Sequence, residues 1–412
     1  MQCSLKQKKK MKTYKLTIGV LVISVGLSLN AFGQSVTIDL QQAIDAALAN
    51  NIGLKAQEKM VQSSRALIPT GFNIEKTQAF YRHDQNDIAE NGFSNSVLGI
   101  SQNLQFPTVY GFQKKINQDR FRMQQQKYEI SKIQVVKEVS KAYYSIVYWK
   151  NLQANYQYLD SLYRQFSIAS SRRFELGETN YLEKITAQSK QREIGVQLAQ
   201  AIESEKNAYM VLEQWIQMDG LVQVGDIQLR KLNVEIIDVD AHPGVVFYEN
   251  AVKMSEHAIG LEQHKLLPDL FAEVFRGTNS GANSKVYPGF QVGVSLPLWF
   301  GAQKAKIGSA RTDREQSQLD NKNFVFQLEN RTEQLTIELK KYMEAIDFYE
   351  QEGKELSDQL IKQASEAFKN GEIDFLQYVL LIENSRNIQV SYLQNLNLYN
   401  MTVLEINYLM NP

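Results

Sequence analysis

Four histidines and one cysteine are the side chains in this sequence that most often serve catalysis or metal binding. His257 and His264 lie seven positions apart on one face of a predicted helix, which could suggest a metal pair. Two helical turns separate them by about 10 Å, too far for one ion, so solvated helix positions are the better interpretation. The sequence has no Ser-His-Asp or Cys-His pattern, no phosphate-binding glycine loop and no methionine cluster. We therefore predict no catalytic residue, no metal site, no cofactor and no enzymatic activity.

Several acidic side chains gather at two short segments that resemble each other. The first reads Arg-Phe-Glu-Leu-Gly-Glu-Thr-Asn-Tyr-Leu over 173–182, and the second reads Lys-Asn-Gly-Glu-Ile-Asp-Phe-Leu over 369–376. A glycine in the left-handed conformation ends a helix without Cβ strain, and Thr179, Asn180 or Asp374 can cap the helix that runs back. Each segment therefore predicts a tight turn between two helices.

The two turns coincide when the sequence is shifted along itself by 194 positions, which places Gly177 on Gly371. The match continues upstream through the preceding segment. Beyond it an offset of 199 brings Pro69 onto Pro268. The second copy has therefore lost about five residues, as a loop would. Two constant offsets over nearly the whole sequence indicate an internal duplication.

Residues 1–33 have the pattern of a signal peptide. Six lysines precede an apolar run over 16–29, and Ala31-Phe32-Gly33 supplies small residues for cleavage. Translation could start at Met1 or Met11. A membrane anchor is the alternative, but a run of about 14 residues is short for a span. Cys3 is too early to be a lipidated N-terminus.

The mature chain expected after cleavage has no cysteine and an excess of acidic residues. The lack of cysteine excludes disulfides and thiolate chemistry. The charge argues against nucleic-acid binding. No later stretch is apolar over the roughly 18 residues that a transmembrane helix needs. A role in a membrane would have to use strands.

Periodicity divides the mature chain into a first repeat over 34–217, an equatorial connector over 218–246 and a second repeat over 247–412. The first repeat is predicted to contain helices over 38–68 (capped by Thr37), a strand hairpin over 72–106, a long helix over 107–174 and a return helix over 180–217. The second is predicted to contain a helix over 247–267, a strand hairpin over 269–300, a long helix over 302–369 and a return helix over 374–410.

The long helices are too long for a compact domain of this size, since about 67 residues span roughly 100 Å. Their apolar residues follow the spacing of a coiled-coil seam. In the first long helix the seam is predicted at Val135, Val139, Ala142, Ile146, Trp149, Leu152, Tyr156, Leu159, Tyr163 and Phe166.

The strand hairpins alternate apolar residues with small or polar ones. Phe290, Val292 and Val294 alternate with Gln291 and Gly293. Such strands suit either half of a soluble sandwich or the wall of a lipid-facing barrel. Aromatic residues gather near the strand ends, as in an interfacial girdle: Tyr81, Phe106, Tyr110, Tyr287, Trp299 and Phe300.

With these features the chain resembles the TolC-type outer-membrane efflux channel family, the outer membrane factors of tripartite exporters. The resemblance covers about residues 37–410 and rests on the signal peptide, the duplication, the hairpins, the long helices and the repeated Phe-x-x-Gly-Glu turn. It implies a mainly α fold with a β-barrel portion. By this resemblance, duplicated helical hairpins are expected to form a periplasmic tunnel, and four strands per protomer are expected to contribute to a trimeric 12-stranded outer-membrane β-barrel.

The resemblance also implies a function. The chain is expected to be a passive exit duct for small molecules or ions in the outer membrane of a Gram-negative bacterium, with its helices in the periplasm. Its expected partners are two further copies of itself (a homotrimer), outer-membrane lipid, a periplasmic adaptor (membrane fusion protein) and an inner-membrane pump of RND or ABC type. The sequence does not identify the cargo, the pump or the adaptor.

Functional residues follow from matching the family's turn motif. The adaptor-docking tips fall on Phe174, Leu176, Gly177, Glu178, Phe368, Asn370, Gly371 and Glu372. The candidates for an inner-mouth gate are Glu183, Asp374, Gln377 and Leu380. The family often has aspartates at the positions of Gln377 and Leu380, which form an acidic ring at the inner mouth. The sequence therefore does not establish such a ring in this protein. A first-turn carboxylate such as Asp374 could instead complement the helix dipole.

Two alternative functions remain at the sequence level. Within the channel class, the chain could serve a type I protein secretion system. In a different class, it could be a soluble periplasmic coiled-coil scaffold whose strands form a sandwich. A channel would need detergent for extraction, whereas the scaffold would not.

Overall fold

The computed structural model describes residues 36–218, 220–225, 228–235 and 241–410. The predicted signal peptide, 1–33, lies outside the described residues, as does part of the predicted connector. The described chain forms two compact units. Each unit contains segments from both repeats, so the units do not coincide with the halves of the sequence.

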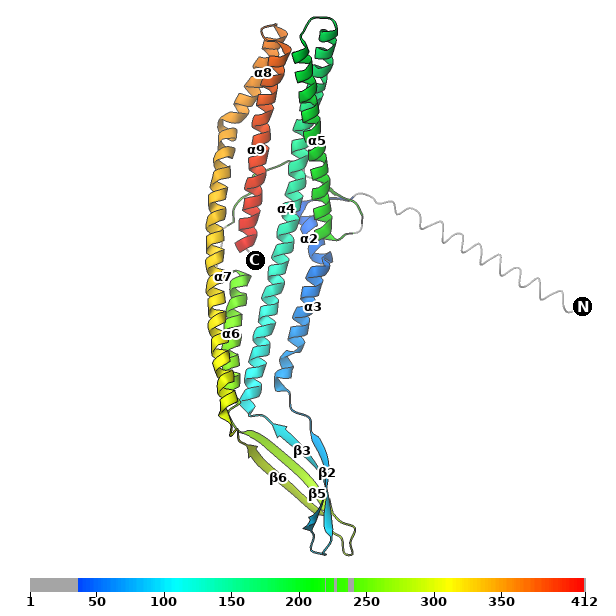
Figure 1. Cartoon of the computed structure of the whole chain (residues 1–412), viewed down its shortest axis with the longest axis vertical. Coiled ribbons are helices and arrows are strands. Elements are labelled where there is room, and N and C mark those ends of the chain that lie inside the picture. Colours follow the sequence, from blue (N-terminus) through cyan, green and yellow to red (C-terminus); the bar gives the residue numbers. More distant parts are fainter. Residues whose placement is uncertain (1–35, 219, 226–227, 236–240, 411–412) are drawn as a thin grey trace, which may run out of the picture. The chain divides into compact units, whose positions relative to one another are not determined.

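The first unit consists of the chain up to Asn50, Val139–Leu229 and Ser357–Leu393. It contains the C-terminal part of α4 (Pro107–Glu175), α5 (Tyr181–Ile216), most of α8 (Lys354–Lys369) and the N-terminal part of α9 (Phe375–Met410). Figure 1 shows α4 with α5 and α8 with α9 as two helical hairpins. Their shared core is made of Leu159, Tyr163, Phe166, Ala187, Ile194 and Val379.

A short strand and helix begin the first unit. Strand β1 (Val36–Ile38) pairs in parallel with β4 (Val222–Val224), and α2 (Leu40–Asn50) packs against α5. The N-cap predicted at Thr37 is wrong, because Thr37 lies in β1. Asp39 caps α2 instead: its Oδ1 accepts a hydrogen bond from the Gln42 N–H at 2.8 Å, and Gln42 Oε1 accepts one from the Asp39 N–H at 3.0 Å.

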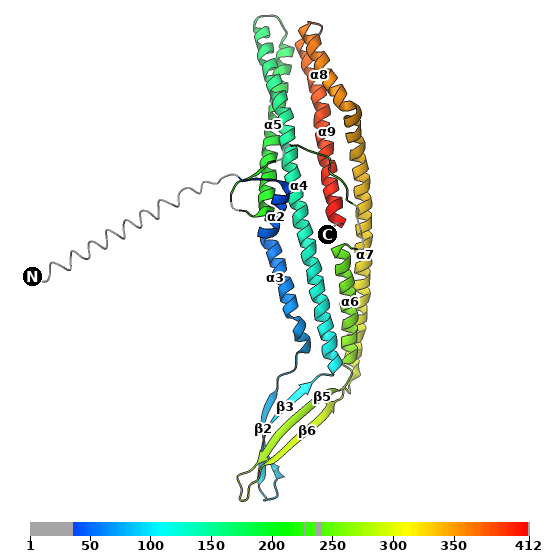
Figure 2. The ribbon, with the colours of Figure 1, turned by 180° about the vertical axis from the view of Figure 1, so that it is seen from behind.

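The second unit consists of Asn51–Glu138, Arg230–Leu356 and the chain from Gln394 on. It contains α3 (Ile52–Ala66), the 3-10 helix η1 (Ile68–Phe72), α6 (Pro243–His264) and α7 (Phe300–Phe348). Helices α6 and α7 lie side by side, as both views show (Figures 1 and 2). The predicted start of α6, residue 247, is four residues late, because Pro243 occupies the first helical position after His242.

The second unit also holds a four-stranded antiparallel sheet. It is formed by β2 (Gln78–Ile88), β3 (Ser94–Leu104), β5 (Asp269–Thr278) and β6 (Tyr287–Ser295), in the order β2-β3-β5-β6. The two hairpins therefore join through β3 and β5, with Ile100 opposite Val274. Strands β2 and β6 are the edges (Figure 1).

The second long helix is not continuous α-helix. A π-helical segment, η2 (Tyr349–Gly353), separates α7 from α8. It lies within the range 302–369 predicted as one helix, and α7 begins at Phe300, two residues before the predicted start. The sequence has no proline and no pair of glycines in this segment that would predict the π-helix. The single glycine of the segment, Gly353, is buried.

Burial confirms most of the coiled-coil seam predicted for α4. Val135, Val139, Ala142, Ile146 and Leu152 are each at most 4% exposed. Leu159, Tyr163 and Phe166 are also buried, whereas Trp149 and Tyr156 are partly buried.

The described part of the connector lies along α9. Asn400 accepts a hydrogen bond from the Leu232 N–H at 3.0 Å and donates one to the Arg230 carbonyl at 2.7 Å. One heptad later, Asn407 bonds in the same way to Glu235 and Asn233, at 3.0 Å each. Two side-chain amides of α9 thus hydrogen-bond to backbone groups of the connector.

Candidate functional site

The first helix-to-helix turn is set by one backbone angle. Helix α4 ends at Glu175, and Gly177 has φ of +75°. The Glu178 N–H donates to the Arg173 carbonyl at 2.8 Å, and the Gly177 N–H donates to the Phe174 carbonyl at 3.0 Å. This pair of bonds is a Schellman motif, which satisfies carbonyls that the ending helix leaves open.

The second turn repeats the same motif. Gly371 has φ of +73°. The Glu372 N–H donates to the Ala367 carbonyl at 2.9 Å, and the Gly371 N–H donates to the Phe368 carbonyl at 3.1 Å. The structural equivalence follows the sequence offset residue by residue.

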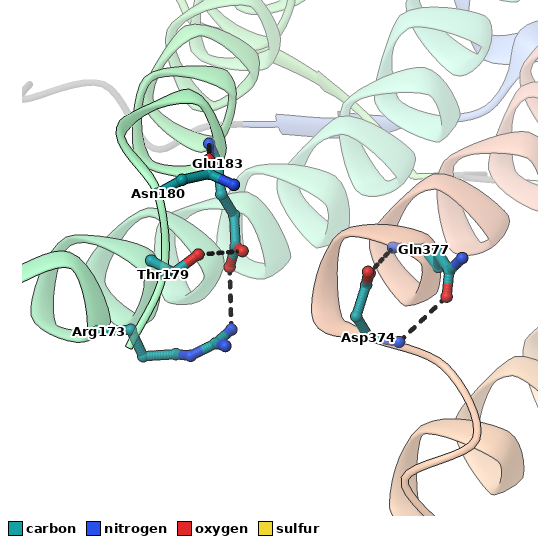
Figure 3. A network of polar contacts seen from close by, with 6 residues as sticks. All are labelled: Arg173, Thr179, Asn180, Glu183, Asp374 and Gln377. Atoms are coloured by element: carbon teal, nitrogen blue, oxygen red, sulfur yellow. Dashed lines mark hydrogen bonds and ion pairs between the residues drawn. The ribbon is translucent and has the colours of Figure 1, made fainter. Parts of the chain in front are cut away.

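The returning helices are capped at equivalent positions (Figure 3). Asn180 Oδ1 accepts from the Glu183 N–H at 2.9 Å, and Asp374 Oδ1 accepts from the Gln377 N–H at 2.7 Å. Gln377 Oε1 also accepts from the Asp374 N–H at 3.1 Å, which completes a capping box. Asp374 and Gln377, two of the predicted gate candidates, therefore both have a structural role at the start of α9.

Glu183 is engaged in a different way (Figure 3). Its carboxylate forms an ion pair with Arg173 at 3.0 Å and accepts a hydrogen bond from the Thr179 hydroxyl. Its side chain is only 18% exposed. The carboxylate thus ties the end of α4 to the start of α5. Arg173 was not predicted to take part in the site, and Thr179 was predicted only as a possible helix cap.

The remaining turn residues point outward or pack locally. Leu176, Glu178, Asn370, Glu372 and Leu380 are exposed. The rings of the tip motif are held by neighbours: Phe174 lies 5.8 Å from Tyr181 with Lys184 Nζ 4.9 Å from its centroid, and Phe368 stacks on Tyr378 at 4.9 Å. The tips therefore present exposed apolar side chains, with Leu176 and Leu182 in the first turn and Phe368 in the second, beside amides and carboxylates.

A polar network that the sequence did not reveal lies in the core of the same unit. The Tyr163 hydroxyl donates to Glu383 Oε2, and Lys190 Nζ donates to Glu383 Oε1 at 3.2 Å. Burial, followed by the hydrogen bond to Glu383, raises the pKa of Tyr163, so the phenol is neutral and donates. The contact joins α4 and α5 to α9 across 220 positions of sequence, which no local pattern could indicate.

One face of the four-stranded sheet is apolar and exposed. The register aligns Ile100, Val274 and Phe290 in one row, and Leu104, Leu270 and Val294 in another. Phe290 is 78% exposed and Val292 is 70% exposed. The alternation predicted from sequence is therefore present, and the unit itself does not cover the apolar side chains.

His257 and His264, predicted to be solvated helix positions, are partly exposed, and each has a hydrogen-bond partner on α4. His257 Nδ1 contacts the buried Asp119 Oδ2 at 2.6 Å, and His264 Nδ1 contacts the Thr108 hydroxyl at 2.5 Å. Both histidines hold α6 to the start of α4. Within the described ranges, no group of three or more His, Cys, Asp and Glu side chains is arranged to hold a metal ion.

Among the described residues, no helix is long and apolar enough to cross a membrane.

Known proteins resemble this chain in structure. No sequence-family model and no curated protein matches it. The crystal structure of CusC has a TM-score of 0.74 at 14% identity, covering 93% of this chain and 96% of CusC. The Campylobacter jejuni CmeC outer membrane channel has a TM-score of 0.73 at 13% sequence identity, covering 93% of this chain and 90% of CmeC. The open Neisseria gonorrhoeae MtrE outer membrane channel has a TM-score of 0.71 at 14% sequence identity, covering 90% of this chain and 88% of MtrE.

The likeness extends over nearly all of each chain. At these identities it establishes a shared fold. The mainly helical fold with two strand hairpins, expected from the sequence resemblance, is thereby confirmed.

Proposed function

We propose that this chain, which has the fold of solved outer-membrane channels, is the outer-membrane exit duct of a tripartite efflux system. It conducts small molecules or ions passively from an inner-membrane pump and a periplasmic adaptor. The duct performs no chemistry, and the pump supplies the energy.

The observation that carries this proposal is the exposed apolar face of a sheet with two open edges. Strands β2 and β6 leave backbone N–H and C=O groups without partners in one copy. In lipid such groups cost several kcal/mol each, so an open edge is not tolerated there. Four strands are too few to close a barrel, whereas three copies supply an even number sufficient for closure.

The turns are proposed to dock the adaptor. Leu176, which is 64% exposed, offers an apolar contact, and Glu178, Asn370 and Glu372 surround it with polar groups. Packed neighbours hold the rings of Phe174 and Phe368, which fixes the shape that an adaptor hairpin would meet.

Gating is proposed at the same end of the helices. Glu183, Asp374 and Gln377 are engaged in capping and ion pairing. The exposed carboxylates of Glu178 and Glu372 are therefore the better candidates for charge at the mouth, with Leu380 as an apolar neighbour. Opening would untwist the helix pairs about Gly177 and Gly371.

Purification and conductance test the channel. We expect the full chain to require detergent, to have the mass of a trimer by light scattering, and to conduct in a planar bilayer. A monomer that dissolves without detergent and does not conduct would contradict the channel and favour the periplasmic scaffold.

Adaptor docking can be tested separately because the mature chain expected after cleavage has no cysteine. A single cysteine at Leu176 should crosslink to the adaptor in cells. Glu372→Arg and Gly371→Pro should reduce both export and crosslinking. Glu366→Arg, the same charge change on an exposed position of α8, is the control. Normal export and crosslinking in Glu372→Arg and Gly371→Pro would exclude the turn as the docking site.

A further inference from the structure

The face of the sheet opposite the apolar one carries phenyl rings seated on glycines. Phe80, Gly99, Phe275 and Gly289 form one row of the register. A Cβ on Gly289 would lie 2.4 Å from Phe275 Cζ, and one on Gly99 would lie 2.5 Å from Phe80 Cζ. The rings therefore lie against the backbone of neighbouring strands, where any larger residue would displace them.

A third phenyl ring also lies against a glycine, and together with Phe275 it flanks a carboxylate. A Cβ on Gly293 would lie 2.3 Å from Phe271 Cε1. On β5, Phe271, Glu273 and Phe275 alternate onto this face, because successive side chains of a strand point to opposite sides. Glu273 thus lies between two rings, and all three side chains are half-buried rather than covered.

The carboxylate of Glu273 has uncharged neighbours. Its row contains Ser101 and Gln291. Among the ion pairs of the described residues, none includes Glu273. Arg82 shares this face, but the row of Phe80 and Phe275 separates its row from that of Glu273.

We propose that this face binds aromatic cations, and that small molecules combining a planar ring with a positive charge are therefore a cargo class of the duct. The inference rests on the proposed function in one respect: it places the apolar face in lipid and this face toward the aqueous lumen. Glu273 supplies the countercharge, and the faces of Phe271 and Phe275 supply stacking and cation–π attraction.

The physical chemistry favours weak, repeated binding. Cation–π contacts at exposed sites are modest, and the lumen remains wet. A channel also needs sites that release what they bind. Three copies of the sheet would repeat the site around the lumen, so that the aromatic cation is concentrated there and still leaves. Aromatic anions would be repelled by Glu273, and cations without a ring would lose the stacking contribution.

Channel block distinguishes these ligands. With the reconstituted full chain, benzyltrimethylammonium should reduce the conductance at concentrations at which tetramethylammonium and benzenesulfonate do not. Glu273→Gln should weaken this block at least threefold and lower the preference for K⁺ over Cl⁻. Phe275→Leu should weaken block by about two- to fivefold, the size of one exposed cation–π contact.

Two controls use the register of the same sheet. Phe290→Leu removes a ring from the opposite face and should leave block unchanged. The double variant Glu273→Gln/Gln291→Glu moves the carboxylate to the directly opposite residue of the same row and should restore block. Restored block would show that the effect of Glu273→Gln comes from losing the carboxylate from this row and not from a folding defect, and a failure to restore block would count against the site.

Binding to the detergent-purified protein, measured by calorimetry, keeps this inference separate from the proposed duct. Benzyltrimethylammonium should bind the wild type, and Glu273→Gln should weaken binding at least threefold even if no conductance is seen. Conductance with unchanged block and binding in Glu273→Gln would overturn the inference and leave the duct standing. Equal binding of benzenesulfonate, or failure of the wild type to bind the cation, would also overturn it.

Discussion

At the residue scale, the two turns depend on a backbone conformation that side chains resist. Gly177 and Gly371 have φ near +75°, and a Cβ added at either position would meet no atom within 4 Å. The cost of replacing them is therefore conformational and not steric. This separates the turn glycines from those of the sheet, where the space itself is occupied.

A matched pair of glycine substitutions tests this reasoning. Gly371→Ala should destabilise the protein by about 1 kcal/mol, because alanine disfavours the left-handed region. Gly308→Ala, in the interior of α7 and also with open space around the added Cβ, should be neutral or stabilising by up to about 1 kcal/mol. Thermal unfolding followed by circular dichroism measures both. Equal effects of the two variants would contradict the assignment of strain to φ.

His242 is a second residue whose state affects stability. Its Nδ1 accepts a hydrogen bond from the Gly244 N–H at 2.9 Å and caps α6, which requires an unprotonated nitrogen. Burial lowers the pKa of His242, and a hydrogen bond with the Leu409 backbone opposes this only in part. The folded-state pKa lies below the ordinary value of 6.5, so protonation favours the unfolded chain.

The stability contributed by neutral His242 should be fully present above the ordinary pKa and be lost as the pH falls through the lower folded-state pKa. His242→Asn keeps a capping side chain but does not titrate. The wild type should therefore lose more thermal stability than His242→Asn between about pH 8 and about pH 5. Parallel pH profiles of the two melting temperatures would argue against a role for His242.

At the element scale, the two helical hairpins of the first unit are joined by a polar contact within an apolar core. Tyr163 from α4 and Glu383 from α9 meet beside the buried side chains of Leu159, Phe166 and Val379. A half-buried carboxylate without partners would be costly, so its two donors, Tyr163 and Lys190, help to define how the hairpins fit together.

Removing the hydroxyl of Tyr163 should lower the free energy of unfolding. Tyr163→Phe should cost about 1.5–3 kcal/mol, the range for hydrogen bonds to charged groups. A double-mutant cycle with Glu383→Gln isolates the pairwise contribution in thermal or chemical unfolding. Tyr158→Phe on the exposed side of α4 is the control and should change stability by less than about 0.5 kcal/mol. Additive effects of Tyr163→Phe and Glu383→Gln would show that the two side chains are not coupled.

The elements also show where two copies of one plan diverge. The turns of the two repeats have the same hydrogen-bond pattern and the same cap positions. The long helices differ, since only the second contains a π-helix within the described residues. Beyond the π-helix the buried positions still keep the offset of 194: Ser357 and Ala364 of α8 are buried, as are Tyr163 and Ser170 of α4.

At the scale of the whole molecule, a single copy of the chain exposes apolar surface whose contact with water is unfavourable. Trp299 is 90% exposed, and Phe290, Val292 and Val294 form an apolar face on β6 beside an open edge. Exposed faces of this kind mark a membrane or protein contact. The proposed trimeric duct supplies both: lipid covers the face, and sister strands pair with the edges.

Adjacent positions of β6 distinguish the two faces. Val292→Glu places a charge on the apolar face and should impair trimer insertion into membranes, because a charged side chain near the lipid midplane is destabilising, by about 2–4 kcal/mol per copy for lysine or arginine and by less for glutamate. Gln291→Glu makes the same charge on the opposite face and should insert normally. Heat-resistant trimer on gels and recovery in the outer-membrane fraction measure the outcome. Normal insertion of Val292→Glu would exclude lipid contact at that face.

Much of the fold followed from patterns local in sequence. The 194-residue offset, the glycine turns and the alternation of β6 were all visible without coordinates, because capping, turn geometry and pleat each depend on a few neighbouring residues. Where local signals competed, prediction failed: Thr37 appeared to be a cap, but pairing with β4 places it in a strand and leaves the cap to Asp39.

The sequence by itself therefore determined the duplicated plan, the two turns and the apolar face. Only the tertiary structure decided that Tyr163 meets Glu383, that His257 binds Asp119, and that rings on β5 rest on glycines of β6. These contacts join residues of different elements, and their partners are chosen by packing and register. No periodicity of one segment can specify a neighbour that another segment supplies.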